Sequence, residues 1–282
     1  MRQTFLAIEA IDGFVVDAVF FEPEAPNKAA TSVIKVHGSG SNYLEVGFEM
    51  PRLSSEGYAV LSINTRQHDS LRETDNFMDV RRDIEAAFYT ALDRGYKNIV
   101  LDGHSLGTAQ VAFYAATNWD QRLRGVILAA AFANLPWKSR NVLIQNEDEY
   151  QKLFTEALQF MADGKQDQVL PTLMHGGGGS PSHAGPVTAQ HFLSYRREFA
   201  SAADTTYWIK KIPRPILMLR GDQDTTILNF EPNWILENAT RAEGSIVPSM
   251  RFVSISGAGH GLRENPDAVI EAELTWLREL GL

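Results

Sequence analysis

The chain of 282 residues contains no cysteine. Disulfide bonds, thiolate catalysis and cysteine-ligated metal sites are therefore excluded. Clusters of lysine and arginine are missing as well, and the formal net charge is −9. Because nucleic acids and anionic membrane surfaces are bound through basic patches, neither is an expected partner.

Long hydrophobic runs and internal repeats are also absent. The longest apolar run, Val126–Ala133, is much shorter than the roughly 20 residues that a membrane-spanning helix needs. Near the amino terminus, Glu9 and Asp12 interrupt the chain before the apolar core of a signal peptide can form. We therefore expect a cytoplasmic protein, and the lack of repeats gives no support to a purely structural role.

The composition that is present is that of a globular protein, with 44% hydrophobic and 22% charged residues. This length is sufficient for one large α/β domain. Apolar, strand-like runs alternate with helical patterns, and the early strands have no helix between them. The sequence thus predicts a mostly parallel sheet, covered by helices on both faces, with an antiparallel edge. The predicted strands are 4–10, 14–22, 32–36, 59–64, 98–101, 123–132, 215–220 and 250–256, and the predicted helices are 83–94, 108–116 and 266–280.

One stretch, residues 134–211, interrupts this alternation because it contains no convincing strand. Its helical patterns cover Glu149–Met161 and Gln190–Phe199, and the flexible run Gly176–Gly179 lies between them. We expect a helical cap inserted between the sixth and seventh core strands, with the core formed by residues 1–133 and 212–282. Since glycines permit large backbone changes, a lid that opens at this glycine run is a further hypothesis.

The most informative motif is Gly103-His104-Ser105-Leu106-Gly107, which separates a strand-like run from a small-residue helix. This pattern is typical of a nucleophile elbow, a tight turn that exposes a serine hydroxyl. Glycines flank the turn because β-carbons there would clash. The following helix directs its free N–H groups toward developing negative charge. Ser105 is the predicted nucleophile.

A serine nucleophile needs a base and an orienting carboxylate. The last predicted strand is followed by Gly259-His260-Gly261, and His260 is the predicted base because the glycines let the loop bring its imidazole to the serine. The preceding strand is followed by Gly221-Asp222-Gln223-Asp224. Both aspartates lie close to the end of this strand, so their positions alone leave the choice of acid open.

Two backbone N–H groups are needed to bind the oxyanion of an acyl-transfer intermediate. Leu106, directly after the serine, is one predicted donor. The other is expected in the turn His37-Gly38-Ser39-Gly40-Ser41, which follows a predicted strand, and Ser39 is the favoured donor there.

The order and spacing of these motifs resemble those of serine hydrolases with the α/β-hydrolase fold. The resemblance covers residues 14–282 apart from the cap, and it implies an eight-stranded, mostly parallel sheet and acyl-enzyme chemistry without a cofactor. Its Gly-x-x-Asp pattern indicates Asp224 as the acid. The position after the preceding strand, which some members use instead, offers only Asn134.

Two residues depart from the pattern of this family. Lys35 lies inside a strand that should be buried, so its ammonium group must find a partner, reach an edge or extend to solvent. Gln67 occupies a turn position at which glycine is common in the family.

The predicted function is hydrolysis of a carboxylic ester of a small or medium molecule by Ser105, Asp224 and His260, without cofactor or metal. We expect a monomer or a homodimer. The same triad can also cleave a carbon–carbon bond, an amide, a thioester or a lactone, and a non-catalytic ligand-binding protein on this scaffold is the alternative from another class. A zinc site is not expected, because no standard ligand spacing fits the cap histidines His175, His183 and His191.

Overall fold

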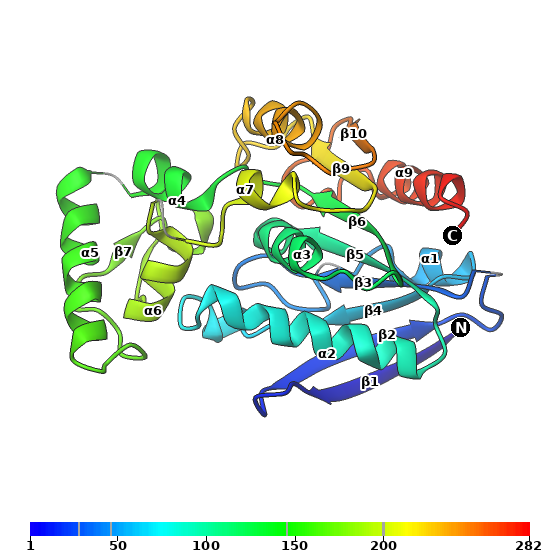
Figure 1. Cartoon of the computed structure of the whole chain (residues 1–282), viewed down its shortest axis with the longest axis horizontal. Helices are drawn as coiled ribbons and strands as arrows, with labels where there is room; N and C mark the ends of the chain where they lie inside the picture. The colour runs from blue at the N-terminus through cyan, green and yellow to red at the C-terminus, as the bar shows by residue number, and fades with distance from the viewer. Residues whose placement is uncertain (28, 46, 145, 199–200) are drawn as a thin grey trace.

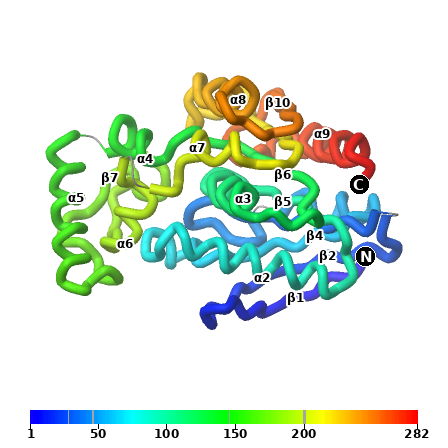
Figure 2. The backbone as a smooth tube through the Cα atoms, in the orientation of Figure 1, coloured from blue at the N-terminus to red at the C-terminus, as the bar shows by residue number. Residues whose placement is uncertain are grey.

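The computed structural model describes residues 1–27, 29–45, 47–144, 146–198 and 201–282. A central eight-stranded sheet, in the order β1-β2-β4-β3-β5-β6-β9-β10, forms its middle layer (Figures 1 and 2). Its strands are β1 (Arg2–Glu9), β2 (Val15–Glu22), β3 (Thr31–Val36), β4 (Ala59–Ile63), β5 (Asn98–His104), β6 (Leu123–Ala129), β9 (Ile216–Gly221) and β10 (Met250–Ile255).

The pairing of the strands follows their hydrophobic patterns. Exposed and less exposed residues alternate in the edge strand β1, which pairs antiparallel with β2, and β2 is antiparallel to β4. The central strand β3 is buried at every position and lies parallel to β4 and β5, as expected for a strand covered on both faces. The predicted eight-stranded, mostly parallel sheet with an antiparallel edge is therefore confirmed.

Helices pack on both faces of the sheet, so that neighbouring residues of one strand enter different cores. Ile34 contributes to the core under α2 (Val80–Asp93), α3 (Leu106–Thr117), α7 (Thr205–Ile209) and α8 (Glu231–Thr240). Val33 contributes to the opposite core, under α1 (Met50–Ser55) and α9 (Pro266–Glu279).

The predicted start of α9 is confirmed, because the Asn265 side chain accepts a hydrogen bond from Ala268 N. α1 and α8 were not predicted, and two short 3₁₀ turns, η1 (Asp69–Leu71) and η2 (Phe77–Asp79), precede α2.

The described residues between 134 and 211 contribute no strand to the eight-stranded sheet. Apart from α7, their helices lie together at one end of the molecule (Figure 1). Nine buried apolar side chains between Ile144 and Phe192 form a separate hydrophobic cluster inside this segment. The elements are α4 (Leu135–Lys138), η3 (Ser139–Leu143), α5 (Glu147–Ala162), β7 (Met174–His175), η4 (Gly177–Gly179), β8 (Ala184–Gly185), α6 (Ala189–His191), η5 (Phe192–Arg196) and α7.

Two expectations for this segment need correction. The segment is not free of strands, because β7 and β8 form an antiparallel pair, and two-residue strands are too short to leave a periodic pattern in the sequence. The predicted helix at 149–161 is confirmed within α5. The helix predicted for 190–199 is shorter than expected, since α6 and the π-helical turn η5 end at Arg196, and Phe199 lies outside the described residues.

The buried ammonium group of Lys35 is surrounded by three acidic side chains. Its ammonium group is hydrogen-bonded to Asp102 on the neighbouring strand, and it lies 3.4 Å from Glu49 and 3.9 Å from Glu273. Burial alone lowers the pKa of Lys35, but the three carboxylates outweigh it and raise that pKa above its ordinary value. The side chain therefore stays charged beneath the carboxyl end of the sheet.

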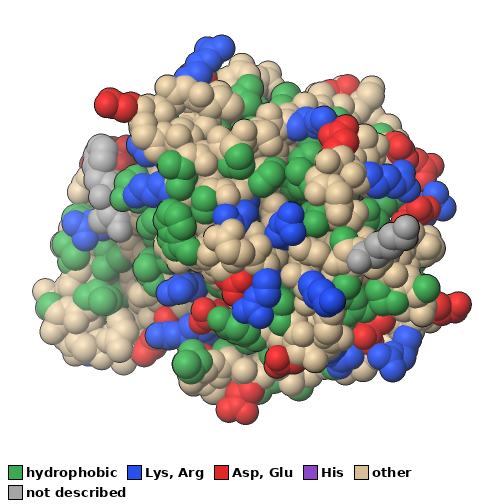
Figure 3. Space-filling model, turned by 45° about the vertical axis from the view of Figure 1, so that its right-hand side comes forward, with side chains coloured by type: hydrophobic (Ala, Val, Ile, Leu, Met, Phe, Trp, Pro, Cys, Tyr) green, Lys and Arg blue, Asp and Glu red, His purple; other side chains and the backbone are tan. Residues whose placement is uncertain are grey.

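On the face drawn in Figure 3, lysine and arginine side chains are mixed with aspartate and glutamate. Within the described ranges, none of the helices is long and apolar enough to cross a membrane.

Candidate active site

The turn between β5 and α3 holds Ser105 in an unusual backbone conformation. Its φ and ψ are 52° and −116°, a region that non-glycine residues rarely occupy and that often marks functional positions. A β-carbon on Gly103 would lie 2.3 Å from the carbonyl oxygen of Gly107, and one on Gly107 would lie 2.3 Å from that of Val36. Only glycine fits at these two positions, so the close packing of the turn explains the motif.

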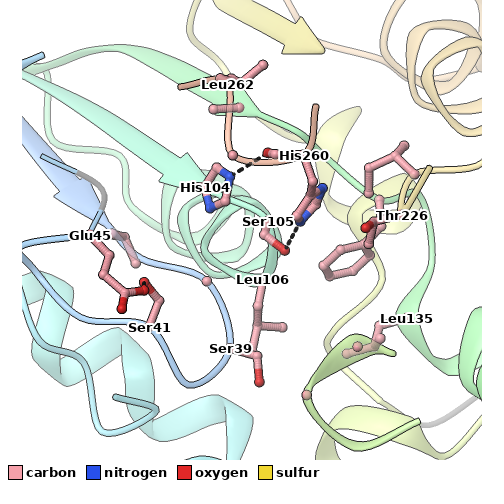
Figure 4. Close-up of a pocket in the computed structure, with 18 of the residues that line it drawn as sticks. Ser39, Ser41, Glu45, His104, Ser105, Leu106, Leu135, Thr226, His260 and Leu262 are labelled. Atoms are coloured by element: carbon pink, nitrogen blue, oxygen red, sulfur yellow. Dashed lines mark hydrogen bonds between the residues drawn. The ribbon is translucent and has the colours of Figure 1, made fainter. Parts of the chain in front are cut away.

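The three side chains predicted to act together are brought into one chain of hydrogen bonds. The His260 Nε2 atom lies 2.9 Å from Ser105 Oγ (Figure 4). The Nδ1 atom of the same ring lies 2.9 Å from Oδ2 of Asp224. A carboxylate only accepts, so Nδ1 carries the hydrogen and Nε2 is left to accept the hydrogen of the serine hydroxyl. The residues come from three separate strand ends, those of β5, β9 and β10.

The Asp224 carboxylate is held on both of its oxygens. While Oδ2 faces His260, Oδ1 accepts hydrogen bonds from the backbone N–H groups of Thr226 and Ile227, at 2.8 and 3.1 Å. Burial raises the pKa of Asp224, but the hydrogen bond and charge of His260, together with the two backbone donors, bring it below its ordinary value. The carboxyl is therefore ionised at neutral pH.

Asp222 lies in a different environment. It is exposed, and its Oδ1 accepts a hydrogen bond of 2.8 Å from Gly257 N in the turn after β10. Instead of closing its own turn, as a turn-forming aspartate would, it ties together the turns after β9 and β10.

The two predicted oxyanion donors lie on the other side of the serine from His260 (Figure 4). Leu106 is the first residue of α3, so its N–H has no partner within the helix. Ser39 follows β3 and lines the same cavity as Ser105. A β-carbon on Gly38 would lie 3.0 Å from Ser105 Cβ, which shows how closely this turn approaches Ser105.

Both motif histidines are neutral and fix the shape of the site. His37 donates from Nδ1 to Gly38 O at 2.7 Å and accepts at Nε2 from Thr65 N at 3.0 Å. His104 donates from Nε2 to the carbonyl oxygen of His260 at 2.9 Å, which tethers the loop of the predicted base. Burial lowers the pKa of His37 and of His104 to about 4, since desolvation penalises the charged imidazolium.

Gln67, which departs from the family pattern, supports the oxyanion turn from below. Its side-chain amide is buried and donates to Asp75, and its backbone carbonyl oxygen accepts the N–H of Gly40 at 3.1 Å. Gly40 has a φ of +65°, which suits glycine at this turn.

A cavity of about 470 Å³ opens over Ser105. One wall consists of strand ends and their loops, and the other comes from residues 134–211. Its apolar lining includes Leu106, Ala129, Phe132, Leu135, Leu143, Ile227 and Leu262. The space over Ser105 thus has a largely hydrophobic lining by area, as is usual for small-molecule sites.

The polar residues that line the cavity from residues 134–211 were not predicted from the sequence. Lys138, Tyr195 and Arg196 are all buried there. Each is paired with a residue distant in sequence: Lys138 with Glu231 at 2.7 Å, Tyr195 with Asp75 at 2.8 Å and Arg196 with Glu73 at 3.3 Å. Such pairs are invisible to local patterns, because the partners are brought together only by the fold.

The three histidines of the segment have separate partners. They contact Glu149, Arg72 and Asp75, in the order His175, His183 and His191. Among the residues with described positions, no group of three or more histidine, aspartate or glutamate side chains is arranged to hold a metal ion.

Comparison with known proteins places this geometry in a family. A model of the alpha/beta hydrolase family matches residues 36–272. No curated protein sequence matches the chain significantly. Among solved structures, the chain resembles alpha/beta hydrolase GrgF from Penicillium sp. sh18, with 14% identity, a TM-score of 0.75 and 100% of each chain covered.

Two further structures cover nearly the whole chain. Est1E from Butyrivibrio proteoclasticus, solved with ferulic acid bound, is 17% identical with a TM-score of 0.70, and the match covers 98% of this chain and 99% of that one. A highly thermostable carboxyl esterase from Bacillus coagulans, in complex with glycerol, is 16% identical with a TM-score of 0.70 and full coverage of both chains. With the family match spanning most of its length, the chain belongs to the alpha/beta hydrolase family.

Proposed function

We propose that this protein is a serine hydrolase that cleaves a carboxylic ester of a small or medium molecule through an acyl-enzyme. The observation that carries the proposal is the continuous chain of hydrogen bonds from Ser105 through His260 to Asp224, opening into one cavity. A nucleophile, a base and an orienting acid at these distances have the geometry that acyl transfer requires.

In the proposed reaction, Ser105 Oγ attacks the ester carbonyl while His260 Nε2 takes its proton. The resulting imidazolium is stabilised by the ionised Asp224, which also keeps the Nδ1 hydrogen in place. His260 then gives the proton to the departing alcohol, and the acyl group stays on the serine. A water molecule, activated by the same imidazole, hydrolyses the acyl-enzyme and releases the acid.

The tetrahedral intermediates carry negative charge on the former carbonyl oxygen. We assign the N–H groups of Leu106 and Ser39 as its donors, because both residues line the cavity beside Ser105. The amino-terminal end of α3 adds the positive end of the helix dipole at the same point. Preorganised donors of this kind supply a large share of the catalytic effect in acyl transfer.

We further propose that residues 134–211 act as a cap that selects the substrate. Leu135 and Leu143 line the cavity from this segment, together with Ala129 at the end of β6 and Ile227 in the loop after β9. The mainly apolar lining favours an uncharged acyl or alkoxyl group of modest size. The esterase identity of the Bacillus coagulans relative agrees with an ester as substrate.

The test is hydrolysis of a chain-length series of p-nitrophenyl esters by the wild-type protein and by Ser105→Ala. We expect the variant to lose at least about 1,000-fold in kcat, because a triad without its nucleophile retains only the contribution of binding and of the oxyanion donors. The preferred chain length then gives the size of the acyl site. Activity of Ser105→Ala within a few-fold of wild type would refute the proposal.

The same experiment separates the alternatives when a phosphonate probe is added. Labelling of Ser105 without ester turnover would indicate a competent triad directed at an amide, thioester, lactone or carbon–carbon bond. The absence of both labelling and turnover would indicate a ligand-binding protein on a hydrolase scaffold.

A further inference from the structure

A buried ion pair joins residues 134–211 to the core beside the site. Lys138, at the end of α4, places its ammonium nitrogen 2.7 Å from an oxygen of Glu231, at the start of α8. The exposed fractions of the two side chains are only 5% and 1%. Charged side chains are rarely buried so completely, and removing one partner of such a pair leaves a costly unpaired charge.

Both members of the pair also hold backbone groups of two different loops. Glu231 accepts hydrogen bonds from Ala133 N at 3.0 Å and from Leu228 N at 2.7 Å. Lys138 donates to the carbonyl oxygen of Thr226 at 2.6 Å. The pair thus fixes the chain where residues 134–211 begin and, at the same time, the loop of residues 224–228.

Only one residue separates this pair from the carboxylate that faces His260. The carbonyl oxygen of Thr226 is held by Lys138, and its N–H is held by Asp224 at 2.8 Å. The peptide groups around Thr226 therefore transmit any displacement of Lys138 to Asp224. A shift of about 1 Å in a catalytic group is enough to lower a rate by roughly 100-fold.

We propose that Lys138 and Glu231 are positioning residues, which hold the loop of residues 224–228 so that Asp224 keeps its contact with His260. The inference rests on the proposed function, because it gives the pair a role in the alignment of the triad. It also makes that alignment depend on the position of α4, which carries both Lys138 and the cavity residue Leu135.

The test compares Lys138→Met, Glu231→Gln and the double variant with the wild-type protein. Each single variant leaves a buried charge without its partner, so we expect both to unfold at lower temperature. The double variant removes both charges and regains most of the lost stability. Its kcat stays at least tenfold below wild type with KM within threefold, because the ammonium group no longer holds Thr226.

Two further measurements distinguish positioning from a general effect on folding. In proton NMR, a hydrogen bond to a carboxylate moves the signal of the His260 Nδ1 hydrogen to low field, and we expect this signal to broaden or disappear in the double variant. Glu22→Gln is the matched control, since Glu22 is a largely buried partner of Arg94, at 3.1 Å, that lies outside the cavity lining. It is expected to lose stability while the low-field signal and kcat stay unchanged.

The outcomes separate this inference from the proposed function. Wild-type kcat and an unchanged low-field signal in the double variant would overturn the positioning role, as would an equal loss of kcat in Glu22→Gln. If the wild-type protein hydrolyses no ester, the proposed function fails, and the NMR signal still decides the role of the pair. Loss of the signal in the double variant then supports positioning, and its retention refutes it.

Discussion

The carboxylate of Asp224 and the imidazole of His260 meet at 2.9 Å, between Oδ2 and Nδ1. They approach from the ends of β9 and β10, two parallel neighbours in the sheet. Asp222, two residues before Asp224, instead contacts Gly257 in the turn that leads to His260. The two aspartates of this short loop thus make different contacts. Asp224 contacts the imidazole of His260, and Asp222 contacts the backbone of the turn after β10.

This division predicts different effects for the two amide variants. Asp224→Asn is expected to lower kcat by roughly 1,000- to 10,000-fold, because an amide neither stabilises the imidazolium nor fixes the hydrogen on Nδ1. Asp222→Asn is expected to change kcat by less than about tenfold, because the amide oxygen still accepts from Gly257 N. Steady-state kinetics on the best p-nitrophenyl ester provide the measurement, and equal losses in both variants would contradict the assignment of Asp224.

The nucleophile turn yields a prediction about stability. Gly103→Ala and Gly107→Ala each drive a β-carbon to 2.3 Å from a backbone carbonyl oxygen, which cannot move aside as a side chain would. We expect losses in the free energy of unfolding on the order of 3 kcal/mol or failure to fold. Gly164→Ala is the control, because its φ is +69° and nothing lies within 4 Å of an added β-carbon. It should lose only about 1 kcal/mol from backbone strain, and similar losses in all three variants would argue against the steric explanation.

The local part of this site was open to prediction from the sequence because its signals are short and contiguous. The turn around Ser105 combines five consecutive residues with a strand before it and a helix after it. The alternation of buried strands with helices likewise predicted the sheet and its antiparallel edge. Position along the chain left the choice between Asp222 and Asp224 open, and only the Gly-x-x-Asp pattern of the family resemblance indicated Asp224, which is the aspartate that contacts His260.

Ion pairs between residues far apart in the sequence could not be predicted, because only the fold brings the partners together. Lys138 and Glu231 are 93 residues apart, and each alone is indistinguishable from an exposed charge on a helix. Lys35 was recognised as anomalous because it interrupts a buried strand, but its partners Asp102, Glu49 and Glu273 come from three different elements. The strands β7 and β8 were not predicted because two residues are too few to leave a periodic pattern in the sequence.

The cluster around Lys35 predicts an unusual dependence of stability on pH. Glu273 is buried, and neither of its oxygens has a hydrogen-bond partner among the described residues. Burial raises the pKa of Glu273 well above its ordinary value of 4.5. The attraction of Lys35 lowers this pKa, whereas repulsion from Asp102 and Glu49 raises it further, so the net shift is upward. A raised pKa means that the folded protein holds a proton that the unfolded chain has lost. The stability that this carboxyl contributes is therefore full below pH 4.5 and falls as the pH rises toward its folded pKa.

Replacement of this carboxyl should remove that part of the pH dependence. Glu273→Gln is expected to match wild type near pH 4 and to exceed it by on the order of 1 kcal/mol at pH 8, since one unit of pKa corresponds to about 1.4 kcal/mol. Denaturant unfolding across this pH range measures the difference. Glu271→Gln, an exposed position on the same helix, is the control and should follow wild type at every pH. A gain from Glu273→Gln that is constant with pH would exclude titration of Glu273 as its cause.

The loop Gly176–Gly179, for which a lid motion was predicted, is tied to the core through Glu73. One oxygen of Glu73 accepts the N–H of Gly178 and also faces the buried Arg196 at 3.3 Å. If the loop opens away from Glu73, it must break a charge-assisted hydrogen bond beside the cavity, so Glu73 is one of the contacts that oppose the motion.

Hydrogen exchange measured by mass spectrometry tests this limit. Glu73→Gln weakens the acceptor, and we expect amide exchange in the loop to become about tenfold faster, corresponding to a loss of about 1.4 kcal/mol in opening free energy. Glu156→Gln is the control, because Glu156 binds Thr172 within the same segment without touching the loop. A phosphonate on Ser105 should slow exchange in the loop if the lid closes over the acylated serine. Exchange that responds neither to Glu73→Gln nor to the phosphonate would show that this loop is no lid, and that substrate must enter beside it.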